Sequence, residues 1–71
     1  MPVRPTYSQV VKILIENGFC MVSQKGSHQK WRNYETGKIT IVPCHGNKPI
    51  PIGTLNSIIR ATGLSKELFG F

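Results

Sequence analysis

The sequence predicts an α+β fold with the element order α-β-β-β-α and a short helical turn at its C-terminal end. Three observations lead to this fold. A chain of 71 residues is long enough for one domain over residues 1–71 and too short for two. Apolar residues recur at helical spacing near both ends, and three short strand-like segments lie between them, separated by turns that contain glycine. The economical layout is a three-stranded antiparallel sheet with both helices on one face.

The first helix is predicted over about residues 7–17. Val10 and Leu14 belong to a broad apolar face at helical spacing. The hydroxyl group of Thr6 or Ser8 can cap the N-terminus, and an Asn-Gly pair at the other end is a typical helix stop. We therefore expect a short amphipathic helix that buries one face.

Three strands are predicted over residues 19–24, 28–34 and 39–43, with a tight turn at residues 25–27 between the first two. Side chains alternate between the two faces of a strand. We expect Trp31 to face the helices and to belong to the core. The second strand then directs one set of side chains to the open face of the sheet, namely His28, Lys30, Arg32 and Tyr34.

The second helix is predicted from Thr54, as its cap, to about Thr62, after a loop rich in glycine and proline at residues 45–53. Ser65 can cap a short last turn. The candidate anchors of that turn are Leu68, Phe69 and Phe71. The same element order describes the double-stranded-RNA-binding domain, which is an analogy at the level of the fold.

The composition is strongly basic, with 9 Lys and Arg against 3 acidic residues, for a net charge of +6. The acidic residues are Glu16, Glu35 and Glu67, far apart in sequence. Two-metal nucleases, Mg²⁺-dependent phosphoryl transferases and paired-carboxylate glycosidases need several carboxylates at one site, so these classes are disfavoured. The charge favours a polyanionic partner, which is RNA, DNA or an anionic membrane surface.

Nothing in the sequence indicates a membrane protein or an exported one. The apolar stretch at residues 10–15 is interrupted by Lys12 and is far too short to span a bilayer. The N-terminus lacks a signal-peptide pattern, so we expect a cytoplasmic protein. Cys20 and Cys44 are then expected to be reduced thiols, and a disulfide would require that the strands carrying them be neighbours.

A zinc site could be imagined from the two cysteines together with His28 and His45. Their spacing argues against it, because the chain has no Cys-x-x-Cys or His-x₃-His pair. Adjacent Cys44 and His45 also point apart in an extended chain. We expect neither a metal nor a small-molecule cofactor.

The middle of the chain concentrates positive charge. It is an expected RNA-binding surface, because cations neutralise phosphates and an exposed aromatic ring can stack on a base. The alternative is that these are ordinary solvated surface charges. The expected RNA contacts are Lys25, Lys30, Arg32, Tyr34, Lys38 and Lys48.

His28 is the strongest candidate for catalysis. Histidine is the side chain that changes charge near neutral pH, and the chain has only two. His28 follows a Gly-Ser pair, beside Lys25. A neutral histidine among cations can take a proton from a ribose 2′-hydroxyl, while the cations stabilise the charge that develops on the phosphate. Ser27 and His45 are possible helpers, and this chemistry needs no metal.

Short segments spread from about Ser8 to Phe69 carry a family resemblance. They include Lys25-Gly26-Ser27-His28, Val42-Pro43, His45-Gly46 and Gly53-Thr54-Leu55. In this order and spacing they resemble the HicA mRNA interferase toxins of bacterial and archaeal toxin–antitoxin systems. The Gly-Ser-His turn, followed by Pro-x-His-Gly and then Gly-Thr-Leu, is the most specific part of the match.

The resemblance implies a double-stranded-RNA-binding-like fold and endoribonucleolytic cleavage of mRNA, which arrests translation. It implies that His28 is the catalytic histidine and that a HicB-type antitoxin covers the site. His45 also matches a family position, where it would be a second acid or base, a phosphate contact or a loop anchor.

Two other functions remain open from the sequence. One is a non-catalytic RNA-binding module, or an inactive toxin homologue, that uses the same basic face. The other is a protein-interaction domain whose basic face meets an acidic partner. The RNA-binding module differs from the ribonuclease only in what His28 does, whereas a salt titration of RNA binding would distinguish the protein-interaction domain.

Overall fold

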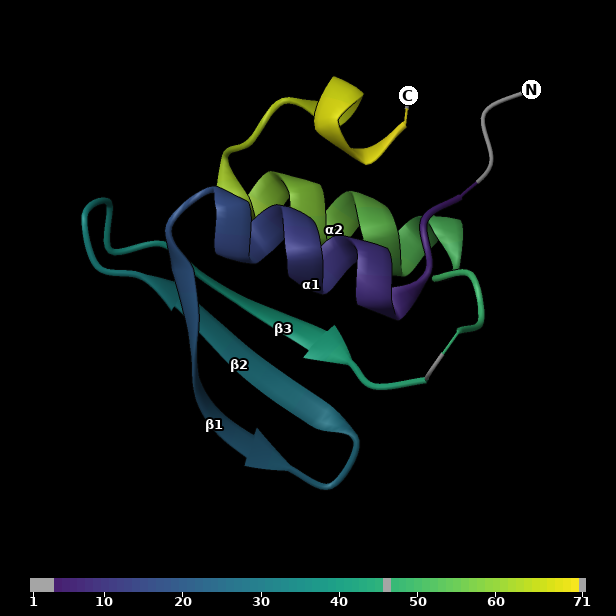
Figure 1. Cartoon of the computed structure of the whole chain (residues 1–71), viewed down its shortest axis with the longest axis horizontal. Coiled ribbons are helices and arrows are strands. Elements are labelled where there is room, and N and C mark those ends of the chain that lie inside the picture. Colours follow the sequence, from purple (N-terminus) through teal and green to yellow (C-terminus); the bar gives the residue numbers. More distant parts are fainter. Residues whose placement is uncertain (1–3, 46, 71) are drawn as a thin grey trace.

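The computed structural model describes residues 4–45 and 47–70, and it confirms the predicted α+β fold. The three strands form an antiparallel sheet in the order β1-β2-β3. Both α-helices lie on one side of this sheet, which leaves the other side open (Figure 1). The elements are α1 (Tyr7–Glu16), β1 (Phe19–Lys25), β2 (His28–Asn33), β3 (Ile39–Pro43), α2 (Ile52–Thr62) and the 3₁₀ helix η1 (Lys66–Phe69).

Helix α1 begins with a capping box. The Thr6 hydroxyl accepts a hydrogen bond from the Gln9 backbone N–H at 3.3 Å, and the Thr6 N–H donates to the Gln9 side chain at 2.8 Å. These two bonds satisfy N–H groups that have no partner within the helix. Val10 and Leu14 are fully buried, as their spacing predicts.

A two-residue turn joins β1 to β2, one residue shorter than the predicted turn. Lys25 pairs with His28 and therefore belongs to β1. Gly26 has a φ of +59°, and Ser27 is not at positive φ. Glycine at the first central position, as the only residue at positive φ, is the type II′ pattern that matches the twist of a hairpin. The turn therefore places His28 at the first position of β2.

The core lies between the sheet and the two helices. Trp31 belongs to it, as predicted, and is 5% exposed. Within the part of the chain that the structure describes, the Trp31 indole N–H has no hydrogen-bond partner. The other buried apolar residues are Tyr7, Val10, Leu14, Phe19, Val42, Ile50, Leu55, Ile58 and Phe69.

Helix α2 begins at Ile52, three residues before the start that a Thr54 cap predicts, and Thr54 is not its cap. Pro51 occupies the N-cap position with an extended ψ of 143°, and its carbonyl accepts the first helical bond from Leu55 at 2.9 Å. Pro51 also makes no side-chain cap. Ile50, expected within a loop, is only 2% exposed, and its N–H donates to the Pro5 carbonyl at 3.0 Å. This buried anchor sets where the helix begins.

The C-terminal turn η1 packs against α1 through Phe69, which is buried as predicted. Leu68 is about half exposed, and Phe71 lies outside the described residues. Ser65 precedes η1, but its hydroxyl donates to the Glu67 carboxylate and its side chain makes no capping bond to the backbone of the turn. This hydrogen bond holds the pKa of the Glu67 carboxyl below its usual value.

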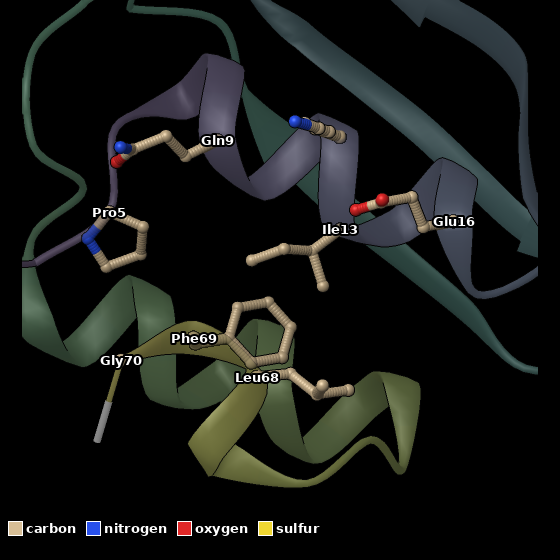
Figure 2. Close-up of a pocket in the computed structure, with 8 residues that line it drawn as sticks. Pro5, Gln9, Ile13, Glu16, Leu68, Phe69 and Gly70 are labelled. Carbon is tan, nitrogen blue, oxygen red and sulfur yellow. The ribbon is translucent and has the colours of Figure 1, made fainter.

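A cavity of about 320 Å³ lies between α1 and η1 (Figure 2). None of its lining residues belongs to the sheet, so it is separate from the face that carries His28. The residues that line it are Pro5, Gln9, Lys12, Ile13, Glu16, Leu68, Phe69 and Gly70.

Gly63 ends α2 in the left-handed region, at a φ of +70°. Gly63→Ala should lower the free energy of unfolding by about 1–2 kcal/mol, because residues with a Cβ disfavour that region. Gly53→Ala is the matched control, since Gly53 lies inside α2 and, among the described residues, no atom outside the local helix backbone lies within 4 Å of an added Cβ. It should raise stability by roughly 0.5–1 kcal/mol. Urea denaturation measures both, and equal effects at the two glycines would refute this explanation.

Candidate active site on the open sheet face

The open face is built from alternate residues of β2 and their neighbours on both sides. His28, Lys30 and Arg32 are exposed, whereas Trp31 and Asn33 are buried against the helix layer. Cross-strand partners project to the same face as the residue they oppose. The partners are Lys25 and Pro43 beside His28, Ser23 and Ile41 beside Lys30, and Cys20 and Ile39 beside Arg32.

His28 is exposed and directly opposite Lys25. Cβ atoms of such a pair are separated by about 5 Å, so an ammonium group can share a ligand with the imidazole ring. Lys30 lies two residues along the same strand face, about 7 Å further on. The candidate base is thus flanked by two cations on one surface.

The loop after β3 leaves the sheet at the end that carries His28. Pro43 pairs with His28, and the Cys44 N–H donates to the Ser27 carbonyl at 2.5 Å. His45 follows directly and is exposed. The structure therefore brings His45 and the Ser27 turn to the same end of the sheet as His28. His28 and His45, which are distant in sequence, are thus brought to one end of the sheet by the pairing of β2 with β3 and by the Cys44–Ser27 backbone bond.

Lys48 is exposed on the same loop, and its N–H donates to the His45 carbonyl at 3.4 Å. This turn keeps the Lys48 backbone close to His45. Lys48 thus belongs to the same end of the molecule as His28, as an RNA contact there would require.

The other end of β2 carries an aromatic platform. The Arg32 guanidinium lies over the Tyr34 ring, 5.1 Å from its centroid, and Tyr34 is 65% exposed. Six residues of extended chain separate Tyr34 from His28, which is roughly 20 Å. This cation–π pair therefore lies several nucleotides of single-stranded RNA away from the histidine.

Lys38 is not brought to His28. It lies in the connection between β2 and β3, at the opposite end of the sheet. Its aliphatic stem runs beside the end of α2, where Cε lies 2.9 Å from the position of a Cβ built on Gly63. Lys38 is separated by the length of the strand from Lys25 and Lys48, and its backbone carbonyl accepts from the Asn33 N–H at 2.9 Å, at the end of β2 that carries Arg32 and Tyr34.

Two apolar residues on the open face were missed by the sequence analysis. Ile39 is 40% exposed and Ile41 is 48% exposed, on either side of the buried Thr40. The alternation of β3 was available in the sequence, but both of its faces carry β-branched residues, so the pattern does not tell which is buried. The open face is therefore partly apolar as well as basic.

Both cysteines are free and exposed. Cys20 belongs to β1 and Cys44 follows β3, and β2 lies between these strands. Among residues 4–45 and 47–70, no three His, Cys, Asp or Glu side chains gather as they would around a metal ion. In the same residues, no helix has the length and apolar character needed to cross a membrane.

The sequence of this domain matches a known family. The family model described as the HicA toxin of bacterial toxin–antitoxin systems matches residues 7–64. The chain belongs to the HicA toxin family. The matched span covers most of the chain, from the first residue of α1 past the end of α2, and includes the whole sheet with His28 and His45. No curated protein matches the chain. Membership of the HicA family supports a role as the toxin of a toxin–antitoxin system.

Proposed function

We propose that this HicA-family chain is a metal-independent endoribonuclease that cleaves mRNA in the cytoplasm and thereby arrests translation. One observation carries the proposal: His28 is exposed on a basic face, directly opposite Lys25, without a carboxylate beside it. The three glutamates of the chain belong to α1, to the connection after β2 and to η1. A site of this kind supplies a base and positive charge, which is what cleavage through the 2′-hydroxyl requires.

In the proposed reaction, a ring nitrogen of His28 removes the proton of a ribose 2′-hydroxyl. The 2′-oxygen bonds to the adjacent phosphorus, and the bond from phosphorus to the 5′-oxygen of the next nucleotide breaks. That leaving oxygen takes a proton from His45 or from water. Lys25 and Lys30 stabilise the extra negative charge on the phosphate in the transition state. The products are a 2′,3′-cyclic phosphate and a 5′-hydroxyl.

The rest of the RNA would follow β2. Arg32 would bind a phosphate, and Tyr34 would stack on a base several nucleotides from the cut. The exposed side chains of Ile39 and Ile41 offer apolar contacts to unstacked bases between these points. Ser27 and Lys48 lie at the cleavage end, whereas Lys38 would reach only RNA that extends past the far end of the sheet.

We also propose a HicB-type antitoxin as the protein partner. A protein that covers the open face would bury Ile39 and Ile41 together with His28, so binding would block the base directly. It would also stabilise the toxin by mass action, because it binds the folded state. This gain matters for a domain of this size, because its core is small.

The test is cleavage of a single-stranded RNA in EDTA, followed by analysis of the new ends. We expect a 2′,3′-cyclic phosphate. A matched RNA with one 2′-deoxy nucleotide at the cleavage position should bind with unchanged affinity and resist cutting there. A plain 3′-hydroxyl product, or cutting of the 2′-deoxy position, would refute the assignment of the 2′-hydroxyl as nucleophile.

The second candidate is an RNA-binding protein without catalysis. The Arg32–Tyr34 pair favours it, since a stacking platform binds RNA whether or not His28 acts as a base. Under this alternative, the wild-type chain binds RNA with an affinity that falls as salt rises, and it never cuts the RNA. A basic face that serves only an acidic protein partner would neither bind RNA nor cut it.

A further inference from the structure

A chain of hydrogen bonds runs behind the turn that precedes His28. The Tyr7 hydroxyl donates to the Gln29 side-chain oxygen. The Gln29 side-chain amide donates to the Gln24 side-chain oxygen at 3.1 Å, and the Gln24 amide donates to the Gly26 carbonyl at 3.1 Å. These bonds connect the first residue of α1 to the turn between β1 and β2.

The Tyr7 hydroxyl also neighbours Cys44, whose backbone provides a second bond to this turn. Burial raises the pKa of the Tyr7 phenol to about 12, and the neighbouring Cys44 thiol adds to the shift. The phenol therefore stays protonated, and able to donate, at every pH at which RNA is handled. The backbone N–H of Cys44 in turn donates to the Ser27 carbonyl. The carbonyls of Gly26 and Ser27, the two residues before His28, thus each accept a hydrogen bond: one from Gln24, which is linked to Tyr7 through Gln29, and one from Cys44, whose thiol neighbours Tyr7.

Little else holds this turn in place. Gly26 and Ser27 are exposed, and among the described residues no atom beyond Gly26 and its two chain neighbours lies within 4 Å of the position of a Cβ on Gly26. No side chain packs on that position, so beyond the strand ladder these hydrogen bonds set where the turn sits. Tyr7 itself is only 8% exposed, which makes it a fixed point in the core from which the bonds extend.

We propose that Tyr7, Gln29 and Gln24 are positioning residues that fix the Gly26–Ser27 turn and so hold His28 opposite Lys25. This inference rests on the proposed role of His28 as the base. A displacement of about 1 Å in a catalytic group can cost a factor of 100 in rate. Loss of the Tyr7 hydroxyl should therefore lower turnover while the RNA-binding side chains of β2 stay in place.

The first arm of the test compares Tyr7→Phe with Thr62→Val at a temperature where both are folded. Tyr7→Phe keeps the ring and removes the hydroxyl. Thr62→Val is the matched control, because it removes another buried hydroxyl, one that donates to the Ile59 carbonyl at 2.9 Å in α2. We expect kcat to fall roughly 10–100-fold in Tyr7→Phe with KM changed less than twofold. Thr62→Val should keep the wild-type kcat, and an equal fall in both variants would overturn the proposal.

A further variant separates the links of the chain. Gln29→Glu retains an oxygen that accepts from Tyr7 but loses the amide that donates to Gln24. We expect its kcat to lie between those of the wild type and Tyr7→Phe. Gln29→Leu, which loses both bonds, should match Tyr7→Phe, and a fully active Gln29→Leu would count against the glutamine link.

The second arm does not depend on catalysis. Amide hydrogen exchange and ¹⁵N relaxation report directly on the turn. Tyr7→Phe should speed exchange of the Cys44 N–H and lower the order parameters of Gly26 and Ser27, with α2 unchanged. If the wild type proves not to cleave RNA, this arm still decides whether Tyr7 fixes the turn. An unchanged turn in Tyr7→Phe, or a loosened turn with unchanged kcat, would overturn the inference.

Discussion

His28→Ala should lower the rate of RNA cleavage by about 10³-fold while RNA affinity falls less than about threefold. A positioned general base contributes typically 10²–10⁴-fold to rate, and His28 is the histidine that β2 directs to the open face. The binding cations Lys25, Lys30 and Arg32 remain in the variant. The measurement is single-turnover cleavage in EDTA beside a filter-binding titration, with urea denaturation to confirm that the fold is intact.

His45→Ala is the matched control, because it removes the same side chain from the same end of the sheet. Its pH–rate profile assigns His45. Loss of the alkaline limb alone would make His45 the acid that protonates the leaving oxygen. An unchanged profile with weaker RNA binding would make it a phosphate contact, and an unchanged profile with unchanged binding would make it a loop anchor. Equal cleavage by His28→Ala and wild type would mean that the base is a different residue, or that the activity belongs to a contaminant.

The helices and strands were predictable because their signals are local. Val10 and Leu14 recur at helical spacing, and both are fully buried. The alternation of the second strand predicted that Trp31 would be buried and Tyr34 exposed, and both predictions are confirmed. These positions obey the period of the element that carries them, so no knowledge of distant contacts was required.

The start of α2 was not predictable in the same way. Thr54 has the chemistry of a cap, and the preceding segment reads as a loop. What decides the boundary is Ile50, which is buried in the core and bonded through its N–H to Pro5, 45 residues earlier in the chain. A local pattern contains no information on such a contact, and tertiary packing outweighs capping propensity there.

In the candidate site too, the features set by local pattern were predictable and those set by contacts between strands were not. The sequence places His28 beside cations on one strand face, but the register of three strands determines which residues meet it. Register puts Lys25 directly opposite His28 and brings the loop with His45 to the same end. It also carries Lys38 to the far end, where its stem lies against Gly63. Charge counted along the chain could not separate these two lysines.

Asn33→Ala should lower the free energy of unfolding by about 2–4 kcal/mol, because buried polar groups lose their partners. Asn33 is 6% exposed and is bonded at both ends of its amide. Its side-chain N–H donates to the Asn17 carbonyl at 3.1 Å. Its side-chain oxygen accepts from the backbone N–H groups of Glu35 at 2.9 Å and Thr36 at 3.1 Å. One side chain thus holds the entry to β1 and the connection after β2.

Asn33→Asp is the matched variant. It keeps an oxygen for the N–H groups of Glu35 and Thr36 but cannot donate to Asn17. We expect about half the loss seen in Asn33→Ala, and urea denaturation measures both. Unchanged midpoints in the two variants would show that these bonds contribute nothing to stability.

Asn33→Ala should reduce the amount of folded protein, whereas His28→Ala should reduce the activity of protein that is folded. A domain of this size is stable by roughly 3–5 kcal/mol, so Asn33→Ala would leave a large unfolded fraction. His28 is the first residue of β2 and Asn33 is the last, so the two lie at different ends of the strand. The folded fraction of Asn33→Ala should therefore retain wild-type kcat. A bound partner or RNA would raise the folded fraction of Asn33→Ala by mass action, because such a ligand binds the folded state. No ligand would restore His28→Ala, since that variant is folded and lacks the base.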